Sequence, residues 1–207
     1  NNLLNPKERI LVTGGAGFIG GALIRSLLKN TECKIYNLDK IGYASDLESI
    51  NKLLINKPDL ENKYEFIKYD LVNENSTSTA IEYVKPDIIF HLAAESHVDR
   101  SIAKPLNFIN SNILGTFNLI NAALDFWSRL PINKKNSFRL IHVSTDEVFG
   151  SLPLSSPTKF TEDTPYEPRS PYSASKASSD HFVRSWYHSF DLPILITNCS
   201  NNYGSYQ

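Results

Sequence analysis

The 207-residue sequence predicts an α/β fold, with a doubly wound parallel sheet and helices on both of its faces. Two observations indicate this class. Short apolar runs alternate along the chain with segments whose apolar residues recur at helical spacing, and a glycine cluster directly follows the first apolar run. Such strand–helix–strand alternation gives parallel strands that are joined by right-handed crossovers, with the helices packed against the sheet.

Six short apolar runs are predicted as strands, at residues 10–12, 34–38, 64–67, 87–91, 139–144 and 194–197. Three longer periodic segments are predicted as helices, at residues 18–28, about 105–127 and about 173–190. In the first of these, Ile19, Leu23, Ile24, Leu27 and Leu28 mark one apolar face. No segment has the composition of a linker, so we predict one domain over residues 1–207.

Two stretches are predicted as connections. Residues 73–79 are polar and are expected to lead from a strand into a helix, with Ser76 or Thr77 as the cap. Residues 150–171 contain prolines at 153, 157, 165, 168 and 171, which lack the backbone N–H that regular structure uses. We therefore expect an extended loop before the last helix.

The composition is that of a globular domain, with 41% hydrophobic and 21% charged residues. Lys and Arg number 21 against 22 Asp and Glu, so the net charge is −1 and no nucleic-acid partner is expected. No apolar run could span a bilayer, and residues 1–9 lack the apolar core of a signal peptide. Cys33 and Cys199 lie far apart without zinc-site spacing. We expect reduced thiols, a cytoplasmic location, no membrane partner and no metal.

Glycines occupy three positions between the first strand and the first helix, Gly14, Gly17 and Gly20. In a dinucleotide-binding turn the first glycine permits the tight turn, the second lets the backbone approach a pyrophosphate, and the third allows close helix packing. The helix N-terminus adds unpaired N–H groups and the positive end of the helix dipole. A flexible glycine loop is the alternative interpretation of this pattern alone.

Asp39 ends the second strand, 19 residues after Gly20, where an acidic residue binds the adenosine ribose hydroxyls of dinucleotides. A carboxylate there would repel a ribose phosphate, which favours NAD over NADP, although the adjacent Lys40 weakens this preference. Asp70 and Leu71 follow the third strand and are candidates for adenine contact, but an Asp is also a common turn residue. The glycine turn and Asp39 together predict a Rossmann-type domain that binds NAD.

Tyr172 and Lys176 form a Tyr-x-x-x-Lys pair at the start of the last helix. Residues four apart share a helix face, and a neighbouring ammonium lowers the pKa of a phenol toward the working pH. Such a phenolate could take the hydroxyl proton of an alcohol whose carbon gives hydride to NAD. Thr145, after the fifth strand, would hydrogen-bond the reacting oxygen. By spacing alone, ordinary surface neighbours are the alternative.

Asp146 and Glu147 follow Thr145 directly, at the sheet edge where doubly wound folds bind ligands. Alcohol oxidation needs no further acid or base, so two adjacent carboxyl groups indicate a second reaction. Once a sugar carbon is a ketone, a carboxylate could remove the neighbouring proton while a carboxylic acid protonates a departing hydroxyl. The alternative is an acidic pair that stabilises a helix start by about 0.3–1 kcal/mol.

The chain resembles the dTDP-glucose 4,6-dehydratase family. The members of this family are extended short-chain dehydrogenases that act on nucleotide sugars. The segments that carry the resemblance are residues 13–20, 37–40, 91–102, 144–150, 170–180 and 197–204. The resemblance covers essentially all 207 residues, and the Thr145-Asp-Glu run and the run at 95–100 are the most specific. Related sugar epimerases usually lack the acid pair, and GDP-mannose dehydratases usually have Ser in place of Asp146.

The resemblance implies a role for each catalytic candidate. Tyr172 would be the base for hydride removal from C4 of the sugar, with Lys176 lowering its pKa and contacting the nicotinamide ribose. Glu147 would take the C5 proton, and Asp146 would protonate the C6 hydroxyl as it leaves. Hydride return to C6 would give a 4-keto-6-deoxy sugar. The implied substrate contacts are His97, Thr145 and Asn201.

The cofactor positions implied by the resemblance lie in the glycine turn, at the ends of the next three strands and in later segments. They are Gly14, Gly17, Phe18, Ile19, Gly20, Asp39, Lys40, Ile41, Gly42, Asp70, Leu71, Leu92, Ala93, Ala94, Glu95, Ser96, Ser111, Tyr172, Lys176 and Asn202. Ser111 departs from the usual threonine of the family but keeps the hydroxyl.

The histidines at 91, 142, 181 and 188 have no metal-ligand spacing and are expected to be structural. In this family the two long helices pack against a second subunit, which implies a homodimer. Phe126, Trp127, Trp186 and Tyr187 are the interface candidates, with core burial as their alternative. The chain has no Met and stops where the family continues into a small domain that binds the nucleotide diphosphate, so we expect a fragment that lacks most of that domain.

The resemblance therefore implies an NAD-dependent hydro-lyase that converts dTDP-glucose to dTDP-4-keto-6-deoxyglucose and water. The nucleobase is left open among dTDP, UDP and CDP. The alternatives are a C4 epimerase or decarboxylase of nucleotide sugars, and a protein that binds NAD without catalysis.

Overall fold

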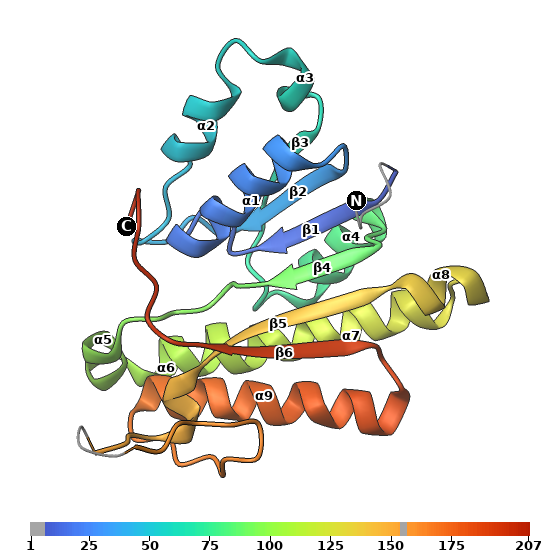
Figure 1. Cartoon of the computed structure of the whole chain (residues 1–207). Coiled ribbons are helices and arrows are strands. Elements are labelled where there is room, and N and C mark those ends of the chain that lie inside the picture. The colour runs from blue at the N-terminus through green and yellow to red at the C-terminus, as the bar shows by residue number, and fades with distance from the viewer. Residues whose placement is uncertain (1–6, 154–156) are drawn as a thin grey trace.

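The computed structural model describes residues 7–153 and 157–207, with a six-stranded parallel sheet at its centre (Figure 1). The strands are β1 (Arg9–Thr13), β2 (Lys34–Asp39), β3 (Tyr64–Lys68), β4 (Ile88–His91), β5 (Arg139–Thr145) and β6 (Ile194–Cys199). Their order across the sheet is β3-β2-β1-β4-β5-β6. This is the Rossmann order, in which the direction of winding changes between β1 and β4. The predicted fold class is confirmed, and each predicted strand overlaps one of the six.

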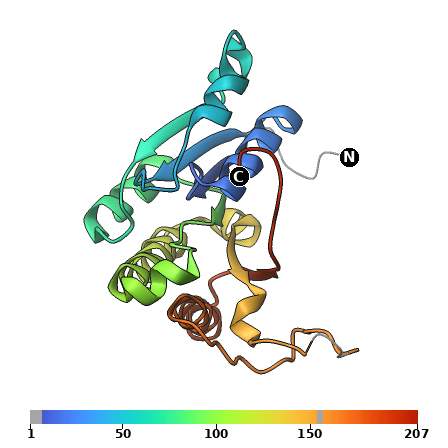
Figure 2. The same ribbon diagram turned by 90° about the vertical axis from the view of Figure 1, so that its left-hand side faces the viewer.

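Helices cover both faces of the sheet, as Figure 2 shows. On one face lie α1 (Phe18–Asn30) and α2 (Glu48–Leu54), and on the other lie α4 (Glu74–Val84), α7 (Gly115–Ser128) and α9 (Pro171–Phe190). The shorter elements are α3 (Pro58–Glu61), α5 (Val98–Ala103), α6 (Pro105–Phe108), the π-helical turn η1 (Ile109–Leu114), α8 (Ile132–Ser137) and the 3-10 turn η2 (Asp146–Phe149). Within the described ranges, no helix is long and apolar enough to cross a membrane.

Side chains along β1 alternate between the two faces. Ile10 and Val12 pack with Ile24 and Leu28 of α1, whereas Leu11 between them packs into the layer of α4, α7 and α9. All five side chains are at most 1% exposed. Because the sheet is buried on both faces, its central strands are nearly continuous apolar runs in the sequence.

The prediction for residues 73–79 is wrong. Helix α4 already begins at Glu74, and its N-cap is Asn73, whose side chain accepts a hydrogen bond from the Ser76 N–H at 2.9 Å. The Thr77 hydroxyl instead donates to the Leu71 carbonyl at 3.1 Å. The first turn of α4 was missed in the sequence because it is polar. The buried side of the helix consists only of Thr77 and the later apolar residues Ala80, Ile81 and Val84.

The segment predicted as one helix at about 105–127 is helical throughout, but α6 and α7 are joined by the π-helical turn η1. The last helix begins at Pro171, close to its predicted start. The predicted loop has neither helix nor strand in residues 150–153 and 157–170. Residues 154–156 of that loop, and residues 1–6 of the polar start, lie outside the described residues.

Candidate active site

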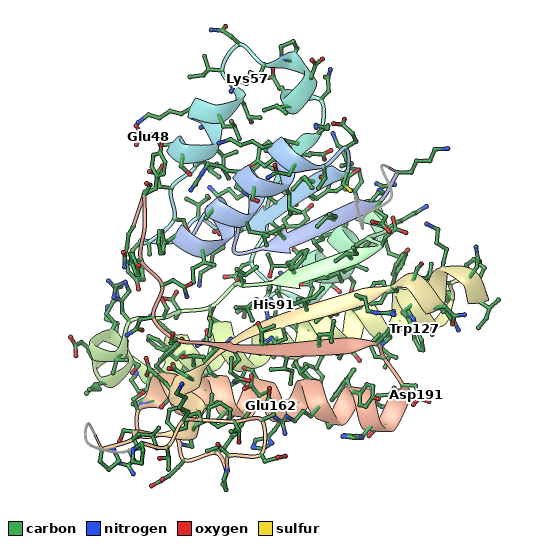
Figure 3. The ribbon with its side chains drawn as sticks, viewed as in Figure 1. Glu48, Lys57, His91, Trp127, Glu162 and Asp191 are labelled. Atoms are coloured by element: carbon green, nitrogen blue, oxygen red, sulfur yellow. The ribbon has the colours of Figure 1, made fainter. Side chains whose placement is uncertain are left out.

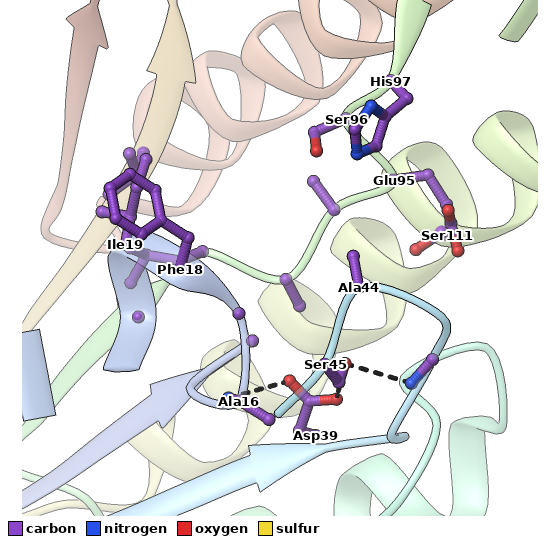
Figure 4. A pocket seen from close by; sticks show the side chains of 18 of the residues that line it. Ala16, Phe18, Ile19, Asp39, Ala44, Ser45, Glu95, Ser96, His97 and Ser111 are labelled. Atoms are coloured by element: carbon purple, nitrogen blue, oxygen red, sulfur yellow. Dashed lines mark hydrogen bonds between the residues drawn. The ribbon is translucent and has the colours of Figure 1, made fainter. Parts of the chain in front are cut away.

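The parallel strands end at one edge of the sheet, and a cleft of about 680 Å³ opens there (Figure 4). Gly14 follows β1, Asp39 ends β2, Asp70 follows β3, Leu92 follows β4 and Thr145 ends β5, and all five line the cleft. The volume is within the range of about 300–1,000 Å³ that is typical of small-molecule sites. Segments that are distant in the sequence thus meet at the carboxyl edge of the sheet, where doubly wound folds bind ligands.

Most of the predicted site residues line this cleft. They are Gly14, Gly17, Phe18, Ile19, Gly20, Asp39, Lys40, Gly42, Asp70, Leu71, Leu92, Ala93, Ala94, Glu95, Ser96, His97, Ser111, Thr145, Glu147, Tyr172, Lys176, Asn201 and Asn202. Two predicted residues, Ile41 and Asp146, do not line it. At Ile41 the backbone has a φ of 59° and the side chain is 37% exposed, and its N–H donates a hydrogen bond to the Asp39 carboxylate at 2.7 Å.

The glycine turn has the close backbone contacts that its sequence predicts. Gly14 has a φ of 74°, and a Cβ atom at Gly20 would lie 2.2 Å from the Gly14 carbonyl oxygen. Gly17 is the N-cap of α1, and no side chain of the described residues caps that helix. The first turn of α1 can therefore offer its N–H groups to an anion in the cleft.

Asp39 joins the glycine turn to the loop after β2 (Figure 4). Its carboxylate is largely buried and accepts hydrogen bonds from the Ala16 N–H at 3.1 Å, the Ile41 N–H at 2.7 Å and the Ser45 hydroxyl at 3.1 Å. Asp70 also has two roles, since it lines the cleft and accepts a hydrogen bond from the Val72 N–H at 3.1 Å, as a turn Asp does.

Lys40 forms an ion pair with Glu95, at 3.1 Å between Nζ and Oε1. The loop after β2 is thereby linked to the segment after β4. A second contact joins the same regions, because the Arg100 guanidinium lies 3.5 Å from the centre of the Tyr43 ring. The Lys40 charge is partly neutralised by Glu95.

The first turns of α9 position the tyrosine and the lysine. Ser170 and Ser173 form a capping box, in which each side chain accepts a hydrogen bond from the other residue's N–H, and Pro171 occupies the first helical position. One turn further on, the Lys176 ammonium is almost fully buried and donates to the Val143 carbonyl of β5 at 2.8 Å. Helix α9 is thus attached to the sheet at the site itself.

The expectation that the pKa of Tyr172 is lowered is wrong for this structure. Burial raises the pKa of Tyr172 to about 12, the Glu147 carboxyl adds to the rise, and a hydrogen bond with Thr145 opposes it. Lys176 does not reverse this shift, because it directs its ammonium to Val143 and burial lowers its own pKa. The Tyr172 phenol is therefore protonated at neutral pH.

Asp146 and Glu147 open the 3-10 turn η2, so the helix-start interpretation describes their backbone correctly. The Thr145 hydroxyl caps the turn by accepting from the Glu147 N–H at 3.2 Å, and it lies 3.4 Å from an Asp146 carboxylate oxygen. Glu147 also lines the cleft. Burial raises the pKa of Glu147, and the Asp146 charge adds to the effect. A carboxylate with raised proton affinity is a stronger base.

Several residues of the cleft were not predicted as site residues. They include Arg25, Tyr43, Ala44, Ser45, Asp46, Ser49, Tyr69, Val143, Ser144, Cys199, Ser200, Tyr206 and Gln207. The strand-end rule could have indicated Val143, Ser144 and Cys199, because they lie at the carboxyl ends of β5 and β6. The others depend on how loops fold back over the edge, which no local pattern specifies.

His91 and His142 are fully buried and hydrogen-bonded, as expected of structural residues. Among the described residues, no group of three or more His, Cys, Asp or Glu could hold a metal ion. Phe126 is 7% exposed and belongs to the core, which is the alternative of core burial, whereas Tyr187 is 51% exposed. Trp127 and Trp186 are partly buried against the same core.

The chain matches the family described as GDP-mannose 4,6 dehydratase over residues 11–207. The dTDP-glucose 4,6-dehydratase of Salmonella typhimurium is 49% identical over an alignment of 205 residues, and the match covers 96% of this chain and 55% of that protein. The dTDP-glucose 4,6-dehydratase 1 of Escherichia coli K12 is 50% identical, with the same coverage. The chain thus spans about half the length of the curated relatives it matches.

Solved structures of similar fold include both dehydratases and epimerases. A dTDP-glucose 4,6-dehydratase from Streptomyces venezuelae with NAD bound has a TM-score of 0.82 and 38% identity, over 96% of this chain and 57% of that one. A UDP-Glc/GlcNAc 4-epimerase from Campylobacter jejuni has a TM-score of 0.77 and 27% identity, over 91% and 52%. With a family match over nearly its whole length, the chain belongs to the GDP-mannose 4,6 dehydratase family.

Proposed function

We propose that this protein is an NAD-dependent dTDP-glucose 4,6-dehydratase, a hydro-lyase. The observation that carries the proposal is that Thr145, Glu147, Tyr172 and Lys176 line the same cleft as a dinucleotide-type glycine turn. A proton-transfer tyrosine, a second base and a cofactor cradle are the parts that oxidation followed by elimination requires.

The residues of the cleft fit NAD. At Gly14 and Gly20 an added Cβ would overlap backbone atoms, so the turn keeps the open shape that a pyrophosphate needs. The N–H groups at the start of α1 would hold the pyrophosphate, and Asp39 would hold the adenosine ribose. Asp70 and Leu71 would border the adenine. The solved Streptomyces venezuelae relative carries NAD, which supports this assignment.

Each catalytic residue has one step in the proposed reaction. A bound NAD would supply the hydride acceptor for C4 of the sugar and the hydride donor for C6, and its positive charge would favour the Tyr172 phenolate. Tyr172 takes the proton of the C4 hydroxyl, while Thr145 hydrogen-bonds that oxygen. Glu147 removes the C5 proton, and Asp146 gives a proton to the C6 hydroxyl, which departs as water. When hydride is added at C6, Glu147 returns the proton to C5. The hydride ends on the sugar, so no net oxidation occurs.

Asp146 bears on the choice of substrate. GDP-mannose dehydratases resemble this chain but usually have Ser at that position, and the curated matches near 50% identity are named dTDP-glucose 4,6-dehydratases. Asp146 does not line the cleft, but it contacts Thr145, which does.

Incubation of the full-length protein with dTDP-glucose tests the proposal. We expect a product that has lost one water by mass and that shows the alkaline absorbance of a 4-keto-6-deoxy sugar. UDP-glucose, CDP-glucose and GDP-mannose serve as comparison substrates. A C4 epimer of unchanged mass would instead indicate the epimerase alternative, and no reaction with any sugar would leave only an NAD-binding protein.

We also propose that the protein is a homodimer that pairs through α7 and α9. The rings of Phe117, Phe182, Trp186 and Phe190 pack in series, with centroids 5.5–6.3 Å apart, and Phe182 and Phe190 are 39% and 47% exposed. A partly exposed aromatic surface of this kind is typical of a protein interface. Sedimentation of the full-length protein would test whether it is a dimer.

We further propose a cytoplasmic location, because Cys33 and Cys199 lie far apart in the sequence and are predicted to be reduced thiols. Cell fractionation would test this location.

A further inference from the structure

A third polar residue continues the face of α9 that carries the catalytic pair. Tyr172, Lys176 and Asp180 are spaced four residues apart, so they lie on one side of the helix. Lys176 is 5% exposed and Asp180 is completely buried. An ammonium in such surroundings is costly unless an opposite charge accompanies it.

Asp180 is held in place by three donors. The His142 Nε2 lies 3.0 Å from Oδ1, and the hydroxyls of Ser144 and Tyr166 donate to Oδ2 at 2.8 and 2.9 Å. Burial by itself favours a protonated carboxyl, yet the hydrogen bonds from His142 and Ser144 and the charge of Lys176 hold the pKa of Asp180 below its usual value. Asp180 is therefore a buried carboxylate at neutral pH.

The histidines beside this pair carry no charge at neutral pH. Burial lowers the pKa of His142 to about 4, and it lowers the pKa of His91 well below its usual value. Figure 3 shows His91 in the interior of the molecule. The other titratable groups that act on Lys176, Tyr172 or the Asp180 carboxylate are Cys199 on β6, Asp146 and Glu147 on η2, and Tyr166 in the loop before α9. Among the charges that support the Lys176 ammonium, Asp180 has the largest effect.

We propose that Asp180 is a positioning residue, the buried counter-charge that keeps Lys176 protonated next to Tyr172. Its catalytic consequence rests on the proposed function, because a charged Lys176 stabilises the Tyr172 phenolate and a neutral one does not. The pairing itself needs no substrate, so it can be tested separately.

Asp180→Asn removes the charge and keeps the shape. His142 can accept a hydrogen bond from the new amide by changing tautomer, because its Nδ1 has no hydrogen-bond partner within the described residues. The full-length protein with NAD bound is labelled with ¹³C at lysine Cε, and Lys176→Met identifies the Lys176 signal. The chemical shift of this signal is followed as the pH is raised, and its midpoint gives the pKa of Lys176. In Asp180→Asn we expect this midpoint to fall by about one pH unit or more below the wild-type value, which is a roughly tenfold weaker proton affinity.

Tyr166→Phe is the matched control, since it removes one hydrogen bond to Asp180 but leaves the carboxylate charge. Its Lys176 midpoint should stay close to that of the wild type. A midpoint in Asp180→Asn that equals the wild-type value, or a shift that Tyr166→Phe reproduces in full, would overturn the proposal.

A stability cycle decides the question if Asp180→Asn folds poorly. When Lys176→Met is added, the unpaired buried ammonium disappears, so the double variant should be more stable than Asp180→Asn alone. If the residues have only packing roles, the two losses add, and the proposal is wrong.

The pH profile of hydride transfer links the pair to catalysis. In single turnover with dTDP-glucose, the alkaline limb of NADH formation should move to lower pH in Asp180→Asn, by the same amount as the Lys176 midpoint. An unmoved limb would contradict a role for Asp180 in catalysis. If the wild type forms no NADH, the proposed function fails, and the titration and the stability cycle still decide whether Asp180 is the counter-charge.

Discussion

Two neighbouring glycines of α1 offer a direct test of the dinucleotide turn. A Cβ atom at Gly20 would lie 2.2 Å from the carbonyl oxygen of Gly14, a backbone atom that can move only if the turn moves. At Gly21 the nearest atoms are the ends of the Arg25 and Ser49 side chains, at 3.3 and 3.4 Å. Alanine at these two positions adds the same group to the same helix, in different surroundings.

The comparison isolates the steric cost. Alanine is favoured over glycine in a helix by about 0.8–1 kcal/mol, and this gain applies to both variants. Overpacking a tight site costs about 1–3 kcal/mol. We therefore expect Gly20→Ala to have a free energy of unfolding about 1–3 kcal/mol below that of Gly21→Ala, measured by denaturant titration of the full-length protein. Gly21→Ala should be at least as stable as the wild type.

NAD affinity should separate the two variants as well. A displaced turn presents its N–H groups to the pyrophosphate less well, so Gly20→Ala should bind NAD at least about tenfold more weakly, a change of about 1.4 kcal/mol. Gly21→Ala should bind like the wild type in the same fluorescence titration. Equal stability and equal affinity of the two variants would refute the steric reasoning.

Four further results are expected. Tyr172→Phe should bind NAD normally but form no NADH in single turnover, because the C4 hydroxyl then has no base; normal NADH formation would remove Tyr172 from that role. Glu147→Gln should accumulate bound NADH without the 4-keto-6-deoxy product, and wild-type product formation would contradict its assignment as the C5 base. Asp39→Ala should lose the hydrogen bonds to Ala16, Ile41 and Ser45 and destabilise the fold by about 1–3 kcal/mol. It should also weaken NAD binding about tenfold or more, and an unchanged binding curve would argue against a ribose contact. At neutral pH the Tyr172 shift has no effect on stability, but the folded state should lose up to about 2.7 kcal/mol as the pH rises from the ordinary pKa of 10.0 to the raised value of about 12. Over that window Tyr172→Phe should lose less stability in denaturant titrations, and parallel curves would show that the pKa is not raised.

The features that could be predicted from the sequence are those encoded within a few residues. The apolar run at 10–12, the glycines after it and the Tyr172–Lys176 spacing each specify local geometry, and parallel topology then places them at one edge. The N-cap of α4 was mispredicted because Asn73, Ser76 and Thr77 are all good caps, and only the buried side of the helix decides among them.

Interactions between distant segments could not be predicted in this way. The partner of Lys40 is Glu95, which lies on a different connection, and nothing in either local sequence indicates the pair. The pKa of Tyr172 rises because the tyrosine is buried next to Glu147, whereas the local Tyr-x-x-x-Lys pattern suggested the opposite sign. Burial is a property of the whole fold, so spacing alone could not supply it.

The polar interior beneath the catalytic helix follows from the alternation of β5. Leu140 packs toward the layer of α9, and His142 and Ser144, at the next alternate positions, both contact Asp180 of that helix. Ile141, between them, packs toward the opposite face. A central parallel strand is usually apolar on both faces, so polar residues at alternate positions indicate a buried polar partner. Asp180 is that partner, and Lys176 lies one turn before it on the same face of α9. The alternation along β5 predicts a buried polar partner, and the i, i+4 spacing on α9 adds the opposite charge. Only the two together indicate a buried charge pair.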